Sequence, residues 1–246
     1  MKLLKKVFVI FITLLLTATT FTLFSCVDPD LAKANSGKIS ALAGNKSLSE
    51  NQGEGASDTI TNDTNNDIKE TIMNGYRETE KRTDYVQITM ENGNTIVIRL
   101  FSQYVPITVS NFKDLVAAHF YDGLIFHRVI AGFMIQGGDP KGNGTGGSGK
   151  TIPAEFVFEL DGQQTIIPHK RGVVSMARGN DPDSASSQFF ICHADSPHLN
   201  GSYAAFGYVV QGMQTVDEIA SVVTDAYDRP LVEQKMRKVT FVDPVE

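Results

Sequence analysis

FHRVIAGFMIQGGD, residues 126–139, is the most informative stretch of this chain of 246 residues. It is apolar and β-branched, with Gly132 in its middle, which predicts one or two strands that bend at the glycine. A plain amphipathic strand pair with Arg128 on its solvent side is the alternative interpretation. That alternative does not explain why Arg128, Phe133, Met134 and Gln136 gather around one bend, so the stretch indicates a functional site.

The segments on either side of this stretch predict a mainly β fold. Tyr85–Met90 and Thr95–Leu100 alternate apolar and polar residues around an Asn-Gly turn, which is typical of a hairpin. One helix is expected to begin at Pro106 and a second to cover residues 213–222. Further strands are expected at residues 155–160, 172–176, 187–192, 205–210 and 238–242. Many strands and two helices indicate a closed or nearly closed antiparallel β structure.

Residues 1–25 predict a secretory signal peptide, because a lysine-rich start precedes an apolar run and then small residues. A membrane-spanning anchor is the alternative, since an apolar run of about 18 residues reaches the lower limit for a span. Residues 23–26, Leu-Phe-Ser-Cys, resemble a bacterial lipobox, although Phe24 departs from the small residue usual there. The resemblance implies lipid attachment at Cys26. Both interpretations place the remainder outside the cytoplasm, at the cell membrane.

Residues 26–82 read as a flexible, lipid-anchored linker, because polar residues and glycine dominate and too few large apolar residues are present to form a core. Ile68, Ile72 and Tyr76 recur at helical spacing and predict a short helix there. Residues 83–246 then suffice for one domain. The formal net charge of −6 argues against nucleic acid as the main partner.

The sequence GTGGSGKT, residues 144–151, fits the phosphate-loop pattern, in which Lys150 and Thr151 would bind a nucleotide and its magnesium. That function requires a strand leading into the loop and a helix leaving it. Several polar and glycine residues separate Ile135 from Gly144, and Pro153 disfavours a helix after the loop. We therefore interpret the match as a glycine-rich surface loop and expect no nucleotide binding.

Two further blocks accompany the first, SMAR to SSQFFI over residues 175–191 and HLNGSYAAFG over residues 198–207. Together the three blocks resemble the cyclophilin family of peptidyl-prolyl cis-trans isomerases, from about Tyr85 to Val242. The FHRVI-x-x-FM-x-QGGD run is highly specific, and SQFFI with L-x-G-x-x-x-x-FG supports it independently. The resemblance implies a closed eight-stranded antiparallel barrel capped by two helices, with a surface groove as the active site.

By position, the resemblance implies a catalytic set of Arg128, Phe133 and Gln136, in which Arg128 supplies a guanidinium and Gln136 holds it together with the substrate backbone. Phe133 also belongs to the walls of a proline pocket, which are Phe133, Met134, Phe190 and Leu199. The remaining substrate-binding residues are Ala177 and Arg178, through their main chain, His127 and Tyr203 at the border of the groove, and His198. His198 replaces the Trp of cyclosporin-sensitive members and Arg178 replaces a common Asn, so drug sensitivity is left open.

The sequence therefore predicts a peptidyl-prolyl isomerase that accelerates rotation about Xaa-Pro bonds of exported proteins. A monomer held at the membrane by lipid is expected, without cofactor, metal, nucleotide or nucleic acid. The alternative is a binding module or chaperone that uses the same groove for proline-containing peptides. The intact set of Arg128, Phe133 and Gln136 favours the enzyme, since holding a peptide would not require all three.

Overall fold

The computed structural model describes residues 72–73 and 75–245. The predicted signal peptide (residues 1–25), the lipid attachment site Cys26 and the predicted linker up to residue 71 lie outside the described residues. Within the described part of the chain, no helix has the length and apolar character needed to cross a membrane.

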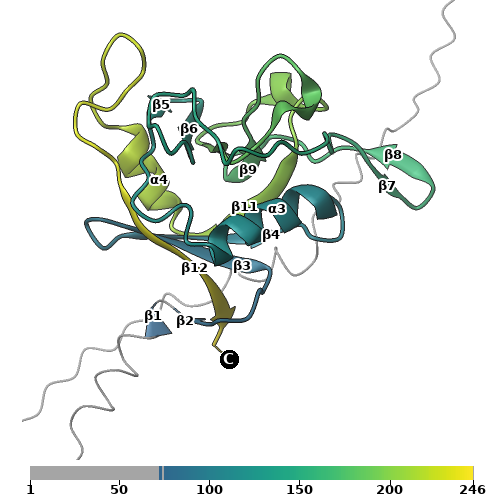
Figure 1. Ribbon diagram of the computed structural model, residues 1–246, viewed down its shortest axis with the longest axis horizontal. Coiled ribbons are helices and arrows are strands. Elements are labelled where there is room, and N and C mark those ends of the chain that lie inside the picture. Colours follow the sequence, from purple (N-terminus) through teal and green to yellow (C-terminus); the bar gives the residue numbers. More distant parts are fainter. Residues whose placement is uncertain (1–71, 74, 246) are drawn as a thin grey trace, which may run out of the picture. The chain divides into compact units, whose positions relative to one another are not determined.

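The described residues form mainly antiparallel β structure with two α-helices (Figure 1). The helices are α3 (Pro106–Ala117) and α4 (Met213–Ala220), and two short 3-10 helices are η1 (Pro182–Ser184) and η2 (Pro197–Leu199). The strands are β1 (Ile72–Met73), β2 (Tyr76–Glu78), β3 (Tyr85–Met90), β4 (Thr95–Leu100), β5 (Arg128–Ile130), β6 (Met134–Gly137), β7 (Phe158–Leu160), β8 (Gln163–Thr165), β9 (Val173–Met176), β10 (Phe189–Cys192), β11 (Ala205–Gln211) and β12 (Met236–Pro244). The mainly β architecture with two helices that the sequence predicts is confirmed.

The main sheet has the strand order β1-β2-β12-β3-β4-β11-β9-β10-β6-β5. From β12 to β5 the order contains eight strands, and every neighbouring pair is antiparallel. The segments that precede β12 and β5, the two end strands of this eight-stranded row, also contact each other. Ile125 and Lys235 form an isolated antiparallel bridge, and Met236 N donates to Leu124 O over 2.8 Å. The two ends of the eight-stranded row are therefore connected immediately outside the strands.

Side chains on the two faces of this row enter two separate apolar clusters. The core cluster contains Val129, Ile135, Ile191 and Val174, which lie opposite one another on β5, β6, β10 and β9. The second apolar cluster consists of Met134, Val173, Phe190, Cys192, Leu199 and Ala205, with further partly buried apolar residues against it. Because successive side chains of a strand point to opposite faces, neighbours in sequence such as Phe189 and Phe190 enter different clusters.

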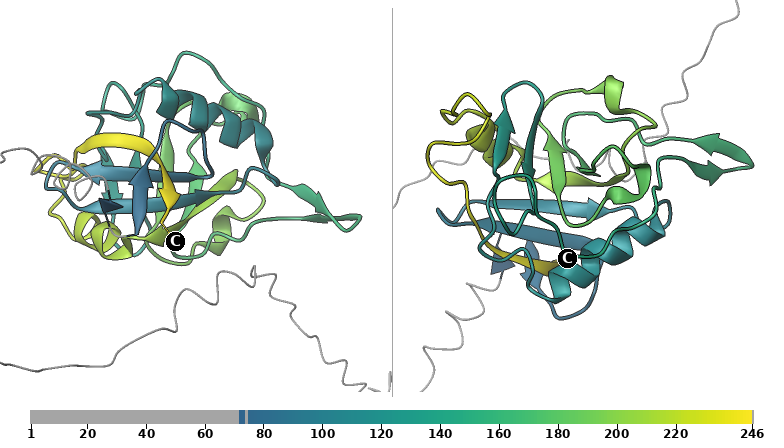
Figure 2. Two further views of the ribbon diagram at one scale, coloured as in Figure 1. Left: turned by 90° about the horizontal axis from the view of Figure 1, so that it is seen from below. Right: turned by 45° about the horizontal axis from the view of Figure 1, so that its top comes forward.

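The two helices cover the core cluster from different sides, with α3 above strands β3 and β4 and α4 below them in the left view of Figure 2. Pro106 occupies the first turn of α3, where a missing N–H costs nothing. The carboxylate of Glu155 accepts hydrogen bonds from Ile107 N and Thr108 N, so it satisfies two of the free donors at that end. Phe112, fully buried, anchors the helix in the core cluster.

The helix predicted from the spacing of Ile68, Ile72 and Tyr76 is wrong for the described residues. Ile72 lies in β1 and Tyr76 begins β2, whereas Ile68 lies outside the described part. The residues of β2 pair with the C-terminal end of β12, where Glu78 lies opposite Val242. Pairing with an available sheet edge thus outweighs a weak local periodicity.

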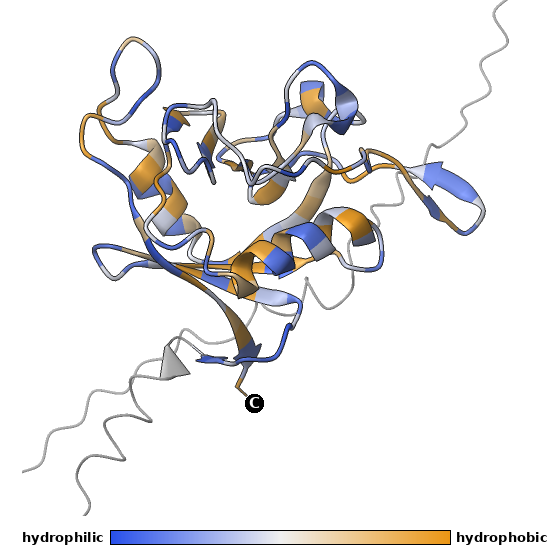
Figure 3. Ribbon diagram, viewed as in Figure 1, coloured by the Kyte–Doolittle hydropathy of each residue, from blue (hydrophilic) through white to orange (hydrophobic). Residues whose placement is uncertain are grey.

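A second difference is the two-stranded sheet of β7 and β8, which projects away from the main sheet (Figure 1). The strand expected from residue 155 begins only at Phe158, and β8 was not predicted at all. Gln163–Thr165 is polar, as its blue colour in Figure 3 shows, so no apolar alternation marks it. Asp161 and Gly162 adopt φ values of 51° and 74°, as a tight primed hairpin turn requires.

Candidate active site

The bend that separates β5 from β6 forms the centre of the site. Gly132 adopts φ of 76°, a left-handed conformation that glycine accepts without strain. Its N–H donates to His193 Nδ1 over 2.8 Å, and Phe133 N donates to Ile130 O over 3.0 Å. The turn at the predicted glycine is therefore confirmed, and it pairs β5 with β6 so that Arg128 lies opposite Gln136.

The strand registers place the cation and the apolar residues on one face. Arg128 lies opposite Gln136, Gln136 opposite Phe190, and Phe190 opposite Ser175, across β5, β6, β10 and β9. Directly opposite residues in an antiparallel pair point to the same face of the sheet. Arg128 therefore lies on the same face as the second apolar cluster, to which Phe190 belongs.

The four predicted walls of a proline pocket come together in this cluster. Met134, Phe190 and Leu199 are buried members, and Phe133 is partly buried against them. The structure thus gathers residues from the β5–β6 turn, β6, β10 and η2 that are up to 66 positions apart, 133 to 199 in the sequence. Ala177 and Tyr203, also predicted site residues, pack against the same cluster.

Behind Phe190 lies a buried histidine that sequence analysis did not assign to the site. The ring of His169 stacks on Phe190 with centroids 6.0 Å apart, and its Nε2 lies 2.9 Å from Ser175 Oγ. Its Nδ1 lies 3.2 Å from Asn200 Oδ1. Burial lowers the pKa of His169, against the effect of the Asn200 hydrogen bond, so the neutral ring is favoured. No sequence motif relates His169 to Phe190.

Gln136 lies opposite Arg128 on β6, but among the described residues its side chain is hydrogen-bonded to Gln188 and not to Arg128. Its Nε2 donates to Gln188 Oε1 over 2.9 Å, and Gln188 Nε2 donates in turn to the carbonyl oxygens of Gly144 and Gly146. Gln136 therefore links β6 to the glycine-rich loop. Arg128 instead forms an ion pair with Asp228, from the segment between α4 and β12.

His127 lies beneath this face and is buried, although it was expected to border the groove. Neither ring nitrogen has a hydrogen-bond partner among the described residues. Burial lowers the pKa of His127; the charge of Asp139 opposes this shift, and those of Arg128 and Arg229 add to it. The neutral form of the ring is therefore favoured, so His127 does not add a second cation next to Arg128.

Arg178 is held in place by its side chain, which explains how it can replace the Asn of many family members. Its Nε donates to Ser202 O over 3.0 Å, and its guanidinium lies 4.8 Å from the ring centroid of Tyr203 and 5.3 Å from that of Phe156. Such cation–π contacts favour a planar guanidinium between two aromatic rings. Ala177 N donates to Gln188 O, whereas Arg178 N has no partner among the described residues. Arg178 thus leaves its own main-chain donor available.

Two further residues complete the description. His198, a predicted site residue, is exposed in η2, and its ring lies 5.3 Å from that of Phe133, beside the second apolar cluster. Cys192 is fully buried in the second apolar cluster, where burial raises the pKa of its thiol to about 12. A thiol that remains protonated is a weak nucleophile, so Cys192 acts as an apolar filler.

The glycine-rich loop uses its own backbone donors internally, so it does not resemble a phosphate loop in structure. The buried carboxylate of Asp139 accepts from Lys141 N, Asn143 N and Gly144 N over 2.8, 3.1 and 2.6 Å. Burial opposes ionisation of Asp139, but these backbone donors outweigh it and lower its pKa. A β-carbon at Gly146 would lie 2.0 Å from Asp139 Oδ1, which explains that glycine. The backbone donors of the loop thus bind an internal carboxylate, and the next element after Thr151 is strand β7 instead of a helix.

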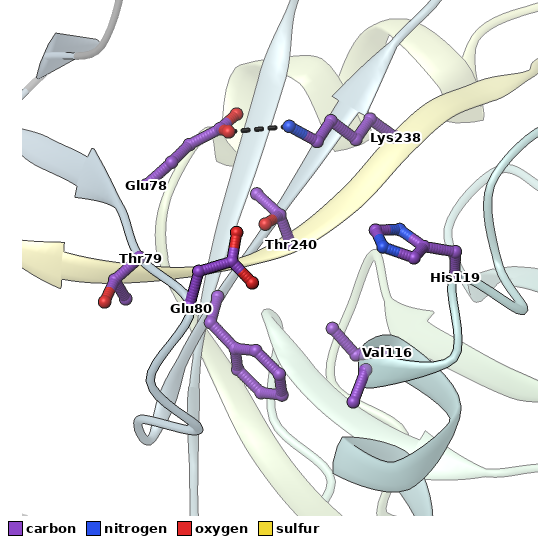
Figure 4. Close-up of a pocket in the computed structure, with 9 residues that line it drawn as sticks. Glu78, Thr79, Glu80, Val116, His119, Lys238 and Thr240 are labelled. Atoms are coloured by element: carbon purple, nitrogen blue, oxygen red, sulfur yellow. Dashed lines mark hydrogen bonds and ion pairs between the residues drawn. The ribbon is translucent and has the colours of Figure 1, made fainter.

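A separate cavity of about 220 Å³ lies between β2, β12 and the end of α3 (Figure 4). Lys238 and Glu78 form an ion pair across it, with Nζ and Oε2 2.6 Å apart, and His119 projects into it from beyond α3. None of the predicted site residues lines this cavity. The residues with an assigned chemical role gather instead on the exposed face of β5, β6 and β10.

The comparisons with known proteins agree with this arrangement. A family described as cyclophilin type peptidyl-prolyl cis-trans isomerase/CLD matches residues 85–241. A peptidyl-prolyl cis-trans isomerase of Arabidopsis thaliana is 43% identical over 153 residues, which are 61% of this chain and 91% of the relative. Peptidyl-prolyl cis-trans isomerase B of Bacillus subtilis is 46% identical over 125 residues, 51% of this chain and 82% of the relative.

A solved structure gives the same result. A cyclophilin type peptidyl-prolyl cis-trans isomerase from Cryptosporidium parvum, whose crystal structure was obtained in the presence of the dipeptide Ala-Pro, has 32% sequence identity to this chain. The superposition covers 63% of this chain and 97% of the Cryptosporidium chain, with a TM-score of 0.57. The chain belongs to the family of cyclophilin-type peptidyl-prolyl cis-trans isomerases, which confirms the predicted family and activity. The alternative of a mere binding module is not favoured.

Proposed function

We propose that this isomerase acts through Arg128, while Phe133, Met134, Phe190 and Leu199 hold the proline ring of the substrate. The observation that supports this proposal is the row Arg128–Gln136–Phe190 across three strands, which places a cation beside the apolar cluster on one exposed face. The roles of the individual residues follow from the resemblance and from this geometry.

The chemistry requires a group that favours the twisted amide. Conjugation in the peptide bond creates a barrier of about 18–20 kcal/mol, so Xaa-Pro bonds rotate slowly without help. Turnover in milliseconds requires the removal of about 5–7 kcal/mol from that barrier. Twisting the bond localises a lone pair on the proline nitrogen. A guanidinium directed at that nitrogen stabilises the twisted state and not the planar one, which accelerates rotation.

The residues around Arg128 bind the substrate and orient its Xaa-Pro bond. The apolar cluster clamps the proline ring while the preceding part of the chain rotates. Arg178 N, which has no partner among the described residues, is available to bond the peptide main chain, and Gln136, bonded to Gln188, lies on the same face as Arg128. His198 and Tyr203 then limit the site at its far side. All these groups bind and orient, and none changes its covalent state.

An isomerisation assay on a Xaa-Pro peptide tests the assignment of Arg128. Arg128→Ala is expected to lower kcat/KM at least about 100-fold, which corresponds to the loss of about 2.7 kcal/mol of transition-state stabilisation. The free energy of unfolding should change little, because Arg128 is exposed. Lys150→Ala, an exposed cation of the glycine-rich loop, is the matched control and should leave both quantities unchanged. Equal rates for the two variants would disprove the assignment.

We also propose that the chain is exported and lipid-anchored at Cys26, and that proline-containing segments of exported proteins are its substrates. The support is the order of the cationic, apolar and Leu-Phe-Ser-Cys segments at the N-terminus. Mass spectrometry of the mature N-terminus tests this, with Cys26→Ser as the variant that should lack lipid. An unmodified Cys26 within an uncleaved segment would favour a spanning anchor instead.

Finally, we propose that the eight strands from β12 to β5 close into a barrel and that the folded domain is a monomer. The support for closure is the bridge between Ile125 and Lys235 with its flanking hydrogen bonds. Protection of the amides of Phe126 and Met236 from hydrogen exchange is the expected result. Fast exchange at both would mean an open sheet, and a concentration-dependent molecular mass in light scattering would exclude a monomer.

A further inference from the structure

We propose that Asp228 is a positioning residue for Arg128, and this inference rests on the catalytic role proposed for Arg128. The carboxylate oxygen Oδ2 of Asp228 lies 3.3 Å from Arg128 Nε. The two residues are 100 positions apart in the sequence, so only the folded chain brings them together. Nothing in the family motif includes Asp228, and Gln136, the residue expected to hold Arg128, is bonded to Gln188.

Arg128 needs such a partner because of where it lies. It begins β5, a strand of three residues at the end of the sheet order, and its side chain is 44% exposed. A free arginine side chain at such a position populates many rotamers, which costs about 2 kcal/mol of conformational entropy when it is ordered. A guanidinium that must point at one nitrogen atom benefits from being ordered before the substrate arrives.

The atom that Asp228 contacts suits this role. Arginine has five N–H donors, one on Nε and four on the two terminal nitrogens. Asp228 bonds to Nε, and the four terminal donors make no hydrogen bond among the described residues, so they are available to the substrate. With Asp228 itself 41% exposed, the pair is weak enough for Arg128 to adjust during the reaction.

The segment that carries Asp228 is built to present it. Asp228 has φ of 63°, a left-handed conformation that aspartate tolerates better than most residues. The carboxylate of Asp225 accepts from Tyr227 N and Arg229 N over 2.8 and 3.0 Å, and Asp225 N donates to Arg229 O. The loop is thereby closed around Asp225 by hydrogen bonds that do not involve Arg128.

The same loop is joined to β5 through the main chain. Val129 N, immediately after Arg128, donates to Asp228 O over 2.8 Å. Asp228 therefore contacts Arg128 with its side chain and the next residue with its carbonyl oxygen. Figure 1 shows this loop, between α4 and β12, beside β5. The main-chain hydrogen bond therefore holds the Asp228 backbone beside β5, which keeps its carboxylate close to the Arg128 guanidinium.

The experiment compares substitutions that preserve the left-handed backbone. Asp228→Gly keeps φ without strain and removes the carboxylate, whereas Asp228→Asn keeps φ and one acceptor oxygen. Asp161→Gly is the matched control, since Asp161 is also an exposed aspartate with positive φ, at the tip of the β7–β8 hairpin. All variants are made in the full chain and assayed on one Xaa-Pro peptide.

We expect Asp228→Gly to lower kcat about three- to tenfold with KM little changed, because a misdirected guanidinium loses only transition-state stabilisation. Asp228→Asn should fall between that variant and the parent, and Asp161→Gly should match the parent. A kcat for Asp228→Gly equal to that of Asp161→Gly would overturn the proposal, as would an Asn variant no better than the Gly variant.

A second measurement separates this inference from the proposed function. The ¹⁵N–¹H signal of Arg128 Nε, identified by its absence in Arg128→Ala, should shift and exchange faster with water in Asp228→Gly but not in Asp161→Gly. An unaltered signal in Asp228→Gly overturns the positioning role even if the enzyme is active. If Arg128→Ala instead keeps the full activity of the parent protein, the proposed role of Arg128 is disproved.

Discussion

Strands β6 and β10 carry two apolar clusters on opposite faces, and the clusters differ in what borders them. On the inner face, Phe189 meets the rings of Phe112, Tyr121 and Phe126 in edge-to-face contacts with centroids 5.7, 5.5 and 6.1 Å apart. On the outer face, its neighbour Phe190 contacts the polar rings of His169 and Tyr203. One strand therefore supplies stability on one side and a binding surface on the other.

The difference lies in the edges of the clusters. The core cluster is enclosed by both helices and the sheet, whereas the second apolar cluster ends at Arg128, Gln136 and Arg178, which are polar and reach solvent. An apolar surface bordered by a few directed polar groups is what a ligand site requires. Substitutions on the two faces should accordingly affect different measured quantities.

The largest effect is expected for Phe189→Ala, on the inner face. Removal of a fully buried phenylalanine typically lowers the free energy of unfolding by about 3–5 kcal/mol, through lost transfer energy and the remaining cavity. Urea denaturation measures this value. The folded fraction should isomerise a Xaa-Pro peptide at nearly the parental rate. A large loss of kcat/KM in the folded protein would show that the inner face also contributes to the reaction.

Phe190→Ala, the matched substitution on the outer face, should act mainly on the reaction. Burial of a phenylalanine side chain contributes about 1.5–3 kcal/mol, and every 1.4 kcal/mol is a factor of ten. We therefore expect kcat/KM to fall about 10- to 100-fold, after correction for any unfolded protein. The comparison with Phe189→Ala is the control. If kcat/KM falls no further than in that variant, Phe190 does not bind substrate.

His198→Trp should sharpen the comparison at the border of the second apolar cluster. The His198 ring lies 5.3 Å from that of Phe133, and an indole would extend the apolar surface there. Cyclosporin should bind the variant more tightly by about 1–2 kcal/mol, from added apolar burial at about 25 cal/mol per Å². Inhibition titrations on one peptide measure this change. Equal inhibition constants would show that His198 does not limit drug affinity.

The pH dependence of stability should come from two buried histidines, since His127 and His169 both have lowered pKa values caused first by burial. Between the folded and unfolded pKa values the unfolded chain binds more protons, so stability is lost as pH falls below about 6.5. Each histidine contributes at most about 1.4 kcal/mol per pH unit. Asp139, whose pKa is also lowered, adds to the loss only at more acidic pH.

His127→Leu tests this assignment, because His127 has no hydrogen bond among the described residues that the substitution would break. Chemical denaturation between pH 7 and 5 should give a smaller slope for the variant than for the parent. Phe189→Ala should keep the parental slope while lowering stability at every pH. An unchanged slope in His127→Leu would mean that the histidine titrates alike in the folded and unfolded chain.

Most elements of the fold and most members of the site could be predicted from local patterns. The alternation in Tyr85–Met90 and Thr95–Leu100 correctly predicts two strands, and the proline that begins α3 correctly marks the start of that helix. The alternation does not predict burial, since Gln87, Thr89 and Thr95 are buried like their apolar neighbours. The motif around Arg128 is contiguous, so a resemblance can be recognised without coordinates. Phe133, Met134, Phe190 and Leu199 were named in this way, and the structure brings them together.

Contacts between distant segments are a different matter, because they depend on how loops dock on the finished sheet. Three such contacts correspond to no periodic pattern in the sequence. They are the pairing of β2 with β12, the hydrogen bonds of the Asp139 carboxylate inside the glycine-rich loop, and the Gln136–Gln188 hydrogen bond. Asp228 is the clearest case, since a turn between α4 and β12 places it against Arg128. Periodicity indicates where a strand or helix forms, whereas the position of a charge beside another charge is decided only when the chain has closed around both.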